Sequence, residues 1–535
     1  MSLACARSIA LIGLEAAVVE IEVWLGSGLP RTVLVGLPDT ALNEARDRCR
    51  AAVSSAGLAW PSQVVTINLT PATLPKAGSH YDLGITAAIL AASGVVPAAR
   101  LEQVILLGEL GLDAKVRPVR GVLPALLAAQ RGGVSRAIVP ASQRAEAGLV
   151  EGIEIHGVAT LADLIALLRG QPVDLPPIAV APAAAPGETV DLADVVGLNE
   201  AKWALEVAAA GRHHLYFHGP PGVGKTLLAR RLPSILPDLT VAEALEVAAL
   251  HSLAGERVDG LVRRPPFADP HHSASLASIA GGGARVARPG AVSLAHRGVL
   301  FLDEAPEFPA KVLEALRTPL EAGEIVLGRS EAQVRYPARF QLVMAANPCP
   351  CGLAATPGAA CSCSAMMIRR YAARLSGPVL DRVDLHQHIV PQRQSLLRAL
   401  PAGEGSAVVL ARVVEARQRQ ARRLAETPWL TNAEVSGGYA RTHLPAPAGV
   451  ECVDEAVRLG RLSARGVDKV VKVAWTIADL AGCDRPEADH LRLALALRQG
   501  EPNPERAQRP AGAGQATPAG GHRSRWQEAG QRRAA

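Results

Sequence analysis

The stretch Leu-Tyr-Phe-His-Gly-Pro-Pro-Gly-Val-Gly-Lys-Thr-Leu-Leu-Ala-Arg-Arg-Leu, residues 215–232, decides the fold of this chain. Its centre, Gly219 to Thr226, fits the pattern Gly-x-x-x-x-Gly-Lys-Thr. The apolar residues before it predict a short buried strand, and Leu227–Leu232 predicts the opening of a helix. A glycine-rich loop between a strand and a helix is typical of a phosphate-binding loop. The alternative is a chance glycine-rich turn, which these flanks disfavour.

The residue types in this loop predict how it binds a nucleoside triphosphate. Its glycines let backbone N–H groups turn inward onto the phosphates, Lys225 supplies charge for the β- and γ-phosphates, and Thr226 offers a hydroxyl to Mg²⁺. The predicted nucleotide-binding residues are Gly219, Pro220, Pro221, Gly222, Val223, Gly224, Lys225, Thr226 and Asp303, of which Thr226 and Asp303 serve the Mg²⁺.

Two later strands predict that the bound nucleotide is hydrolysed. About eighty residues after the loop, the apolar run Val299–Leu302 ends on Asp303 and Glu304. Asp303 is expected to hold Mg²⁺, and Glu304 to orient and deprotonate the attacking water. A further apolar strand ends on Asn347, which is placed to help position that water. Each pattern is weak alone, but together with the phosphate-binding loop they predict a hydrolytic site.

Two arginines are candidates for stabilising the transition state. Phosphoryl transfer spreads negative charge over the γ-oxygens, and a cationic side chain from a neighbouring subunit is the usual remedy. Arg382, in Leu-Asp-Arg-Val-Asp-Leu, is one candidate. Arg465, at a predicted helix start, is the other, and it is free to close over the nucleotide of its own chain. From the residues alone, a surface ion pair is an equally good interpretation of either arginine.

The amino-acid composition limits the classes of protein to which this chain can belong. A chain of 535 residues suggests two to four domains, and 49% hydrophobic with 20% charged residues excludes global disorder. Aromatic residues at 3% make stacking platforms for bases scarce, and a net charge of +6 permits a polyanionic partner without requiring one. No apolar run is long enough for a membrane helix. We therefore expect a cytoplasmic protein with reduced cysteines and no membrane partner.

The domain organisation is indicated by changes in composition. Residues 1–170 alternate strands and helices, 171–189 form a Pro/Ala linker, and 190–395 hold the phosphate-binding loop. Residues 405–498 are mainly helical, and 499–535 form a basic tail that we expect to be disordered. The predicted helix Ala407–Ala425 carries five arginines, for which a solvated face is favoured over DNA contact.

The order of these motifs resembles that of AAA+ ATPases. Finer motifs resemble the magnesium-chelatase-like branch and, within it, the ComM/YifB family, over residues 1 to about 497: Asp-Pro-His-His-Ser (269–273), Gly281–Gly283, Ala-His-Arg-Gly (295–298), Asn-Pro-Cys-Pro-Cys-Gly (347–352) and Leu-Ser-Gly-Pro-Val-Leu-Asp-Arg-Val-Asp (375–384). The resemblance implies an α/β fold, an AAA+ P-loop domain with a helical lid, and ATP as the nucleotide. It makes Asn347 sensor 1, Arg382 the arginine finger and Arg465 sensor 2, in a homo-hexameric ring.

The amino-terminal domain resembles the α/β proteolytic domain of Lon proteases, a ribosomal-S5-domain-2-like fold. The resemblance rests on Leu-Pro-Lys-Ala-Gly (74–78), Leu-Gly-Glu-Leu-Gly-Leu (107–112) and Arg-Pro-Val-Arg-Gly (117–121). A Ser-Lys dyad needs its nucleophile and its amine within reach of each other. The matched positions hold His80 and Ala125 instead, and Ser79 is one residue out of register without a matched amine. We therefore expect a protease-like fold without peptidase activity.

Four cysteines follow the predicted sensor 1 strand. Cys349, Cys351, Cys361 and Cys363 lie within fifteen residues, which is compatible with a tetrahedral Zn²⁺ site, although these pairs are tighter than Cys-x-x-Cys. The alternative is four reduced surface thiols. The adjacent His271 and His272 favour a loop that touches nucleic acid or a neighbouring subunit over a metal site.

The resemblance implies an ATP-driven ring motor that acts on single-stranded or branched DNA, in branch migration during natural transformation. The candidate DNA contacts are Arg285, Arg288 and Arg329, the last at the turn of a predicted hairpin from Ile325 to Val334. The first alternative is a chelatase-type motor that remodels a protein or porphyrin-chelatase partner, against which the Lon-like domain counts. The second is an ATP-dependent protease, against which His80 and Ala125 count. Three positions depart from the family pattern, in which Ala268, Ala291 and Trp475 are usually Arg, Glu and Arg.

Overall fold

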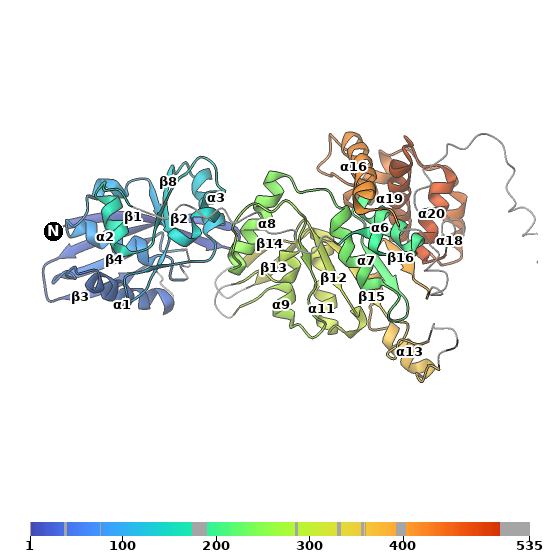
Figure 1. The fold of residues 1–535 in the computed structure, drawn as a ribbon, viewed down its shortest axis with the longest axis horizontal. Helices are drawn as coiled ribbons and strands as arrows, with labels where there is room; N and C mark the ends of the chain where they lie inside the picture. Colours follow the sequence, from blue (N-terminus) through green and yellow to red (C-terminus); the bar gives the residue numbers. More distant parts are fainter. Residues whose placement is uncertain are drawn as a thin grey trace, which may run out of the picture.

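The computed structural model describes residues 2–36, 40–74, 76, 78–173, 190–283, 287–328, 333–354, 358, 360–391 and 403–502. Figure 1 shows a sheet domain at the amino-terminal end, a central domain built on a second sheet, and a bundle of carboxyl-terminal helices. Most of the predicted linker and nearly all of the predicted tail lie outside the described residues. In the part of the chain that is described, no helix is both long and apolar enough to cross a membrane.

The first domain is a seven-stranded sheet in the order β3-β4-β2-β1-β5-β8-β9. It begins with a long antiparallel hairpin, and along its second strand Val19, Ile21 and Val23 point into the core while the residues between them are more exposed. The strands of this sheet are β1 Ser2–Ile12, β2 Glu15–Gly26, β3 Arg31–Val35, β4 Val64–Thr70, β5 Val104–Leu106, β8 Arg136–Pro140 and β9 Glu154–Val158. Two short strands, β6 Glu109–Leu110 and β7 Val116–Arg117, pair with each other in a separate sheet. The helices are α1 Thr40–Ser55, α2 Asp82–Ala92, α3 Val122–Arg131, α4 Arg144–Ala147 and α5 Leu161–Leu168.

The central domain is a five-stranded, wholly parallel sheet in the order β11-β12-β15-β10-β16. Its two strands β12 and β15 are buried along their whole length, as expected of a sheet covered on both faces. The strands are β10 Leu215–His218, β11 Phe267–Ala268, β12 Val299–Leu302, β15 Gln341–Ala346 and β16 Leu385–His388. Because all five run the same way, their carboxyl ends meet at one edge of the sheet.

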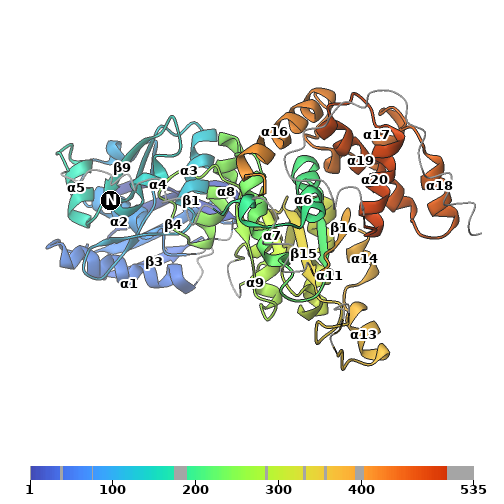
Figure 2. The ribbon, with the colours of Figure 1, turned by 45° about the vertical axis from the view of Figure 1, so that its right-hand side comes forward.

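Helices and one hairpin complete this domain. The helices are α6 Asn199–Gly211, α7 Lys225–Arg231, α8 Val241–Ala254, α9 Leu276–Ala280, α10 Ala291–Leu294, α11 Ala310–Ala315, α12 Arg317–Ala322, α13 Ala365–Ala372 and α14 Gly377–Leu380. The predicted hairpin is present as β13 Glu324–Gly328 and β14 Gln333–Pro337. In Figures 1 and 2, α13 projects away from the body of the domain.

The carboxyl-terminal helices share a hydrophobic core with the parallel sheet. Val413, Val473 and Leu491 belong to the same buried cluster as Phe217 and Val343. Figure 2 shows these helices beside α6, which lies between them and the sheet. They are α16 Ser406–Arg423, α17 Gly437–Thr442, α18 Glu451–Arg458, α19 Ala464–Ala481 and α20 Ala488–Gln499.

The basic helix α16 corrects the expectation of a solvated arginine face. Four of its arginines dock the helix onto its own chain, and neither solvent nor DNA is needed to explain them. Arg412 pairs with Glu206 and Glu404, Arg417 donates to the carbonyl of Ala209, Arg419 donates to the carbonyl of Asp479, and Arg423 pairs with the Asp479 carboxylate. The guanidinium of Arg423 also lies 4.3 Å from the ring of the buried Trp475, one of the three positions that depart from the family pattern.

The first domain packs against helix α8 of the central domain. Ala248 and Ala249 of α8 belong to a buried cluster with Leu123 and other residues of the first domain. The backbone N–H of Gly121 donates to the carbonyl of Ser252 at 3.2 Å, and the Ser252 hydroxyl donates to the buried carboxylate of Glu146. Apolar burial and a satisfied polar pair therefore hold the two domains together.

Candidate nucleotide site

The phosphate-binding loop is built for close approach of a ligand to the backbone. Gly222 and Gly224 have φ angles of +77° and +94°, in the left-handed region that side chains disfavour. A side chain at Gly219 would lie 2.3 Å from the carbonyl oxygen of Ile389, so only glycine fits there. Helix α7 begins at Lys225, directly behind the loop. Free N–H groups of this helix start face the loop, as anion binding requires.

Lys225 is held where phosphates are expected to bind. It is buried, and its Nζ donates to the carbonyl oxygens of Gly219 and Pro220 at 2.6 and 2.8 Å and to Asn347 Oδ1 at 2.9 Å. Burial lowers the pKa of Lys225, while the nearby carboxylates of Asp303 and Glu304 oppose that shift. The ammonium group of Lys225 therefore donates all three of its hydrogen bonds to uncharged oxygens. An anionic phosphate is a stronger acceptor than these oxygens and can replace them.

The magnesium ligands proposed from sequence lie together. Thr226 Oγ1 donates to Asp303 Oδ2 at 2.7 Å, and the other oxygen of Asp303 accepts the N–H of Glu304 at 2.9 Å. A hydroxyl and a carboxylate are the hard oxygen ligands that Mg²⁺ prefers. The residues present therefore fit a Mg²⁺ ion bound together with nucleotide phosphates.

Glu304 stands at the carboxyl end of β12 in a left-handed conformation, with a φ of +51°. Its carboxylate lies 3.6 Å from Nδ1 of His272, whose ring also meets Phe308 edge-on. Sequence reasoning assigned His271 and His272 to contact with nucleic acid or a neighbour. The structure places His272 beside the predicted general base, and contact with nucleic acid or a neighbouring subunit stays a prediction. The missed signal is the short strand β11, which brings the histidine loop to this edge.

Asn347 completes the site at the end of β15. Strands β10, β15 and β12 are neighbours, so the loop, Asn347 and the Asp303–Glu304 pair lie on three adjacent strand ends. This is the edge of a parallel sheet where ligands bind in open α/β folds. The groups assigned to phosphate, Mg²⁺ and water are thus brought together by topology, although they are spread over more than 120 residues of sequence.

Arg382 and Arg465 lie at the opposite edge of the same sheet. Arg382 precedes β16, and that strand runs parallel to β10, so Arg382 is near the strands' amino ends, whereas Gly219 follows their carboxyl ends. Both arginines contact one carboxylate, that of Glu321 in α12, at 2.5 and 3.3 Å. The structure thus pairs Arg465 with Glu321, and its closing over the nucleotide of its own chain stays an untested alternative.

Ion pairs tie the carboxyl-terminal helices to this amino edge. Asp381 lies 3.7 Å from Arg465 and 3.4 Å from Arg498, and Lys469 Nζ lies 2.5 Å from Asp384. Lys469 helps keep the pKa of the buried Asp384 carboxyl well below its ordinary value, despite the opposing effect of burial. The segment that carries Arg382 is thus held by ion pairs of Asp381 before it and of Asp384 after it.

Buried histidines surround the two central strands. His213 is fully buried and His214 is half-buried, and burial lowers the pKa of each to about 4. His213 Nε2 lies 2.8 Å from Thr476 Oγ1, and His214 Nδ1 accepts the N–H of Leu342 at 3.0 Å. These neutral imidazoles therefore link the strands to each other and to helix α19.

Acid should destabilise the central domain below about pH 6.5. Between that pH and about 4, the unfolded chain protonates His213 and His214 while the folded chain does not, so the unfolded state gains protons and stability falls. The expected loss at pH 5 is about 2 kcal/mol for each histidine. The thermal midpoint should be lower at pH 5.0 than at pH 7.5, and His156→Gln should leave this difference intact. An unchanged midpoint would contradict the assignment.

The remaining predicted residues are the four candidate zinc ligands and the three candidate DNA contacts. Cys349, Cys351, Cys361 and Cys363 converge, with sulfur atoms all within 4.8 Å of one another, and so form a group able to hold a metal ion. Arg288 is exposed, whereas Arg285 and Arg329 lie outside the described residues.

The matched Lon positions contain no Ser-Lys dyad in the part of the chain that is described. Ser79 donates to Glu109, His80 lies 2.7 Å from the carbonyl of Ile9, and Ala125 is buried. The buried Lys76 donates to the carbonyls of Gly36, Pro71 and Leu74.

Comparison with known proteins places this site in a family. The family model described as "Magnesium chelatase, subunit ChlI" matches residues 191–397, "Subunit ChlI of Mg-chelatase" matches 21–143, and the subunit ChlI carboxyl-terminal model matches 403–498. The chain is 42% identical over 507 residues to competence protein ComM of Haemophilus influenzae, covering 93% of this chain and 98% of that protein. The chain belongs to the ComM/YifB family of magnesium-chelatase-like AAA+ proteins.

Other relatives show how far the ComM/YifB likeness extends. An uncharacterized protein of Mycobacterium tuberculosis is 52% identical over 503 residues, covering 93% of this chain and 99% of that protein. The magnesium-chelatase 38 kDa subunit of Rhodobacter capsulatus is 28% identical over 171 residues, covering 29% of this chain and 49% of that protein. Full-length similarity therefore joins this chain to the ComM/YifB proteins, and the match to the chelatase subunit is partial.

Proposed function

We propose that this protein is an ATP-hydrolysing AAA+ ring motor whose active sites are shared between neighbouring subunits. The observation that carries the proposal is the placement of its two sets of charged groups. The phosphate-binding loop, Asp303, Glu304 and Asn347 share the carboxyl edge of the parallel sheet, and Arg382 with Arg465 occupies the amino edge. A ring contact that brings the amino edge of one subunit to the carboxyl edge of the next completes every site.

Within one site, the loop N–H groups and Lys225 bind the phosphates of ATP and orient the γ-phosphate. Thr226 and Asp303 would hold a Mg²⁺ ion, which would supply neutralisation of the phosphate charge. Asn347 and Glu304 hold the attacking water, and Glu304 accepts its proton. The partner's arginines stabilise the charge that develops on the γ-oxygens. Helices α16–α20 act as the lid of the AAA+ fold, and α19 carries Arg465 to the subunit interface.

The ring is a homo-hexamer in this proposal, as the resemblance to AAA+ ATPases implies, and a head-to-tail contact between identical subunits is compatible with a closed ring. Its substrate is single-stranded or branched DNA, which it moves by branch migration during recombination in natural transformation. Support for that substrate comes from the ComM relative, which is named a competence protein. The exposed Arg288 beside Gly282 offers charge for phosphate contact without reading sequence. The first domain is a Lon-like fold without peptidase activity.

DNA should stimulate ATP hydrolysis by the purified full chain. Single-stranded DNA and a branched junction should each raise turnover, and the increase should fall with added salt because phosphate contacts release counterions. Steady-state phosphate release with and without DNA at two salt concentrations provides the measurement. If neither DNA binds or stimulates, the DNA substrate is wrong, although the ATPase assignment is not affected.

A chelatase-type motor is the second candidate, and the family models favour it. All three models are described by the magnesium-chelatase subunit ChlI, and one of them matches residues 21–143 in the first domain. That match removes the argument that this domain counts against a chelatase role. ATP turnover unaffected by DNA but raised by a partner protein would favour this candidate.

A further inference from the structure

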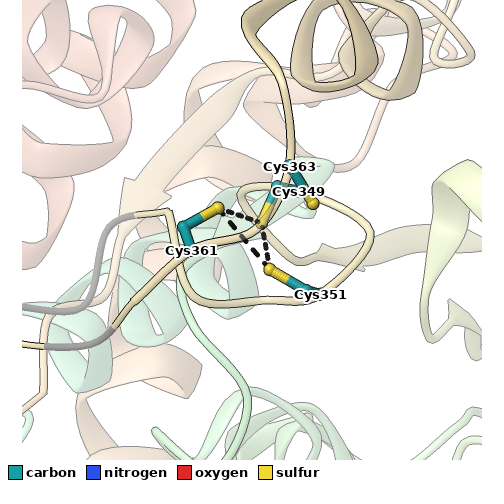
Figure 3. Close-up of side chains that lie close together, drawn as sticks. All are labelled: Cys349, Cys351, Cys361 and Cys363. Carbon is teal, nitrogen blue, oxygen red and sulfur yellow. Dashed lines mark hydrogen bonds between the residues drawn. The ribbon is translucent and has the colours of Figure 1, made fainter.

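Four cysteine side chains gather beside the nucleotide site, and no role in ATP hydrolysis requires them. Cys349 and Cys351 come directly after Asn347, and Cys361 and Cys363 come from the segment that leads into α13. Figure 3 shows their sulfur atoms close together although the chain enters from two directions. Cys349 is fully buried and the other three are half-buried.

The distances between the sulfur atoms distinguish a metal site from a disulfide. Sγ of Cys349 lies 3.3 Å from that of Cys351 and 3.8 Å from that of Cys361, and Cys351 and Cys361 are 3.6 Å apart. A disulfide needs a sulfur–sulfur distance of about 2.05 Å, so these cysteines are not bonded to one another. A tetrahedron with metal–sulfur bonds of about 2.3 Å has edges of about 3.8 Å. Three of the sulfur atoms therefore have the spacing of thiolates around a single ion, and the fourth, that of Cys363, lies within 4.8 Å of them.

The surroundings of the cysteines also suit a tetrathiolate site. The backbone N–H of Ala354 points at Sγ of Cys349 at 3.4 Å, and such N–H contacts stabilise charge on a metal-bound sulfur. With four protein ligands, no coordination position is left for water or substrate, which is the pattern of structural zinc sites.

The loop that carries these cysteines lies directly on the phosphate-binding loop. Gly352, which comes after Cys351, has a φ of +80°, and a side chain there would lie 2.6 Å from Cδ of Pro221. The same loop begins two residues after Asn347, which accepts a hydrogen bond from Lys225. An ion that closes the cysteine loop therefore constrains Asn347 and the Pro221 side of the phosphate site together.

We propose that Cys349, Cys351, Cys361 and Cys363 bind one structural Zn²⁺ ion that braces sensor 1 against the phosphate-binding loop. Binding requires all four thiols to be deprotonated, so the protons are released to solvent as the site fills. The ion does not touch substrate. The effect of the zinc ion on ATP binding rests on the proposed function. The presence of the zinc ion does not depend on that function.

Metal analysis of the purified full chain tests the site without ATP. We expect about one zinc per chain, complete loss of that zinc in Cys361→Ser, and retention in Cys361→His, because histidine is also a zinc ligand. Cys452→Ser is the matched control and should keep the metal, since Cys452 lies in α18 and its thiol donates to the carbonyl of Gly449. A chain without metal, or one with iron in place of zinc, would overturn the proposal.

Two further measurements separate the site from its consequences. Intact mass under denaturing, metal-free conditions should show all eight cysteines reduced, and a disulfide within the cluster would contradict the proposal. ATP binding should weaken in Cys361→Ser and recover in Cys361→His. Should Cys361→Ser fail to fold, removal of zinc from the wild-type chain by a chelator should weaken ATP binding, and re-addition should restore it. If zinc is present but has no effect on ATP binding, the proposal that the ion holds sensor 1 against the phosphate-binding loop is wrong.

Discussion

Replacement of Glu304 by glutamine should lower ATP turnover by about 10²- to 10⁴-fold, the range expected when a general base is removed. The amide keeps the size of the side chain but cannot accept a proton from the attacking water. Nucleotide binding should persist, because Lys225, Thr226 and Asp303 supply it and are unchanged. Phosphate release and fluorescent-nucleotide binding, measured on one preparation, separate the two effects.

Glu307→Gln is the matched control for this variant. Glu307 lies three residues further on, is exposed, and pairs with Arg374 at 2.7 Å at the surface. It should keep turnover near that of the wild type. A Glu304→Gln protein that still hydrolyses ATP at a comparable rate would show that another group accepts the proton, and His272, 3.6 Å from Glu304, would be the first to examine.

Replacement of Arg382 by alanine should lower turnover by about 10³-fold or more, as loss of an arginine finger does in related chemistry. The stronger test is a mixture of two inactive variants. Lys225→Ala has a defective phosphate site but intact arginines, and Arg382→Ala has the reverse. In mixed rings, about one quarter of neighbouring pairs assembled at random combine an intact site with an intact arginine. Turnover should therefore reappear on mixing.

Two controls define this mixing experiment. Arg374→Ala, which removes an exposed arginine paired with Glu307, should keep turnover. Arg465→Ala should behave like Arg382→Ala in the mixture, because both side chains lie on Glu321 at the same edge. A mixture that stays inactive, although both variants assemble, would mean that each arginine serves the nucleotide of its own chain.

Much of the nucleotide site was predictable because its parts are local in sequence. The phosphate-binding loop needs a strand before it and a helix after it, and β10 and α7 are both present. Asp303, Glu304 and Asn347 were found because buried parallel strands leave continuous apolar runs whose ends are easy to locate. The hairpin β13–β14 was found for a similar local reason.

The partners of charged side chains could not be predicted. The arginines of α16 resemble a solvent-facing stripe in sequence, yet Arg412, Arg417 and Arg423 find acceptors on α6, α19 and the segment before α16. The position of His272 beside Glu304 was not predicted, because β11 contains two residues, too few to leave a periodic signal. The packing of the first domain on α8 likewise depends on surfaces that meet only after folding.

By itself, the sequence predicted which residues would handle phosphate, Mg²⁺ and water, because that chemistry depends on residue type and on the strand end beside it. The tertiary structure alone decided where Arg382 and Arg465 stand relative to that site. Their position depends on strand direction and order, since in a parallel sheet the residues before a strand and the residues after it lie a full strand length apart. That separation is the physical reason for expecting each active site to be completed by a neighbouring subunit.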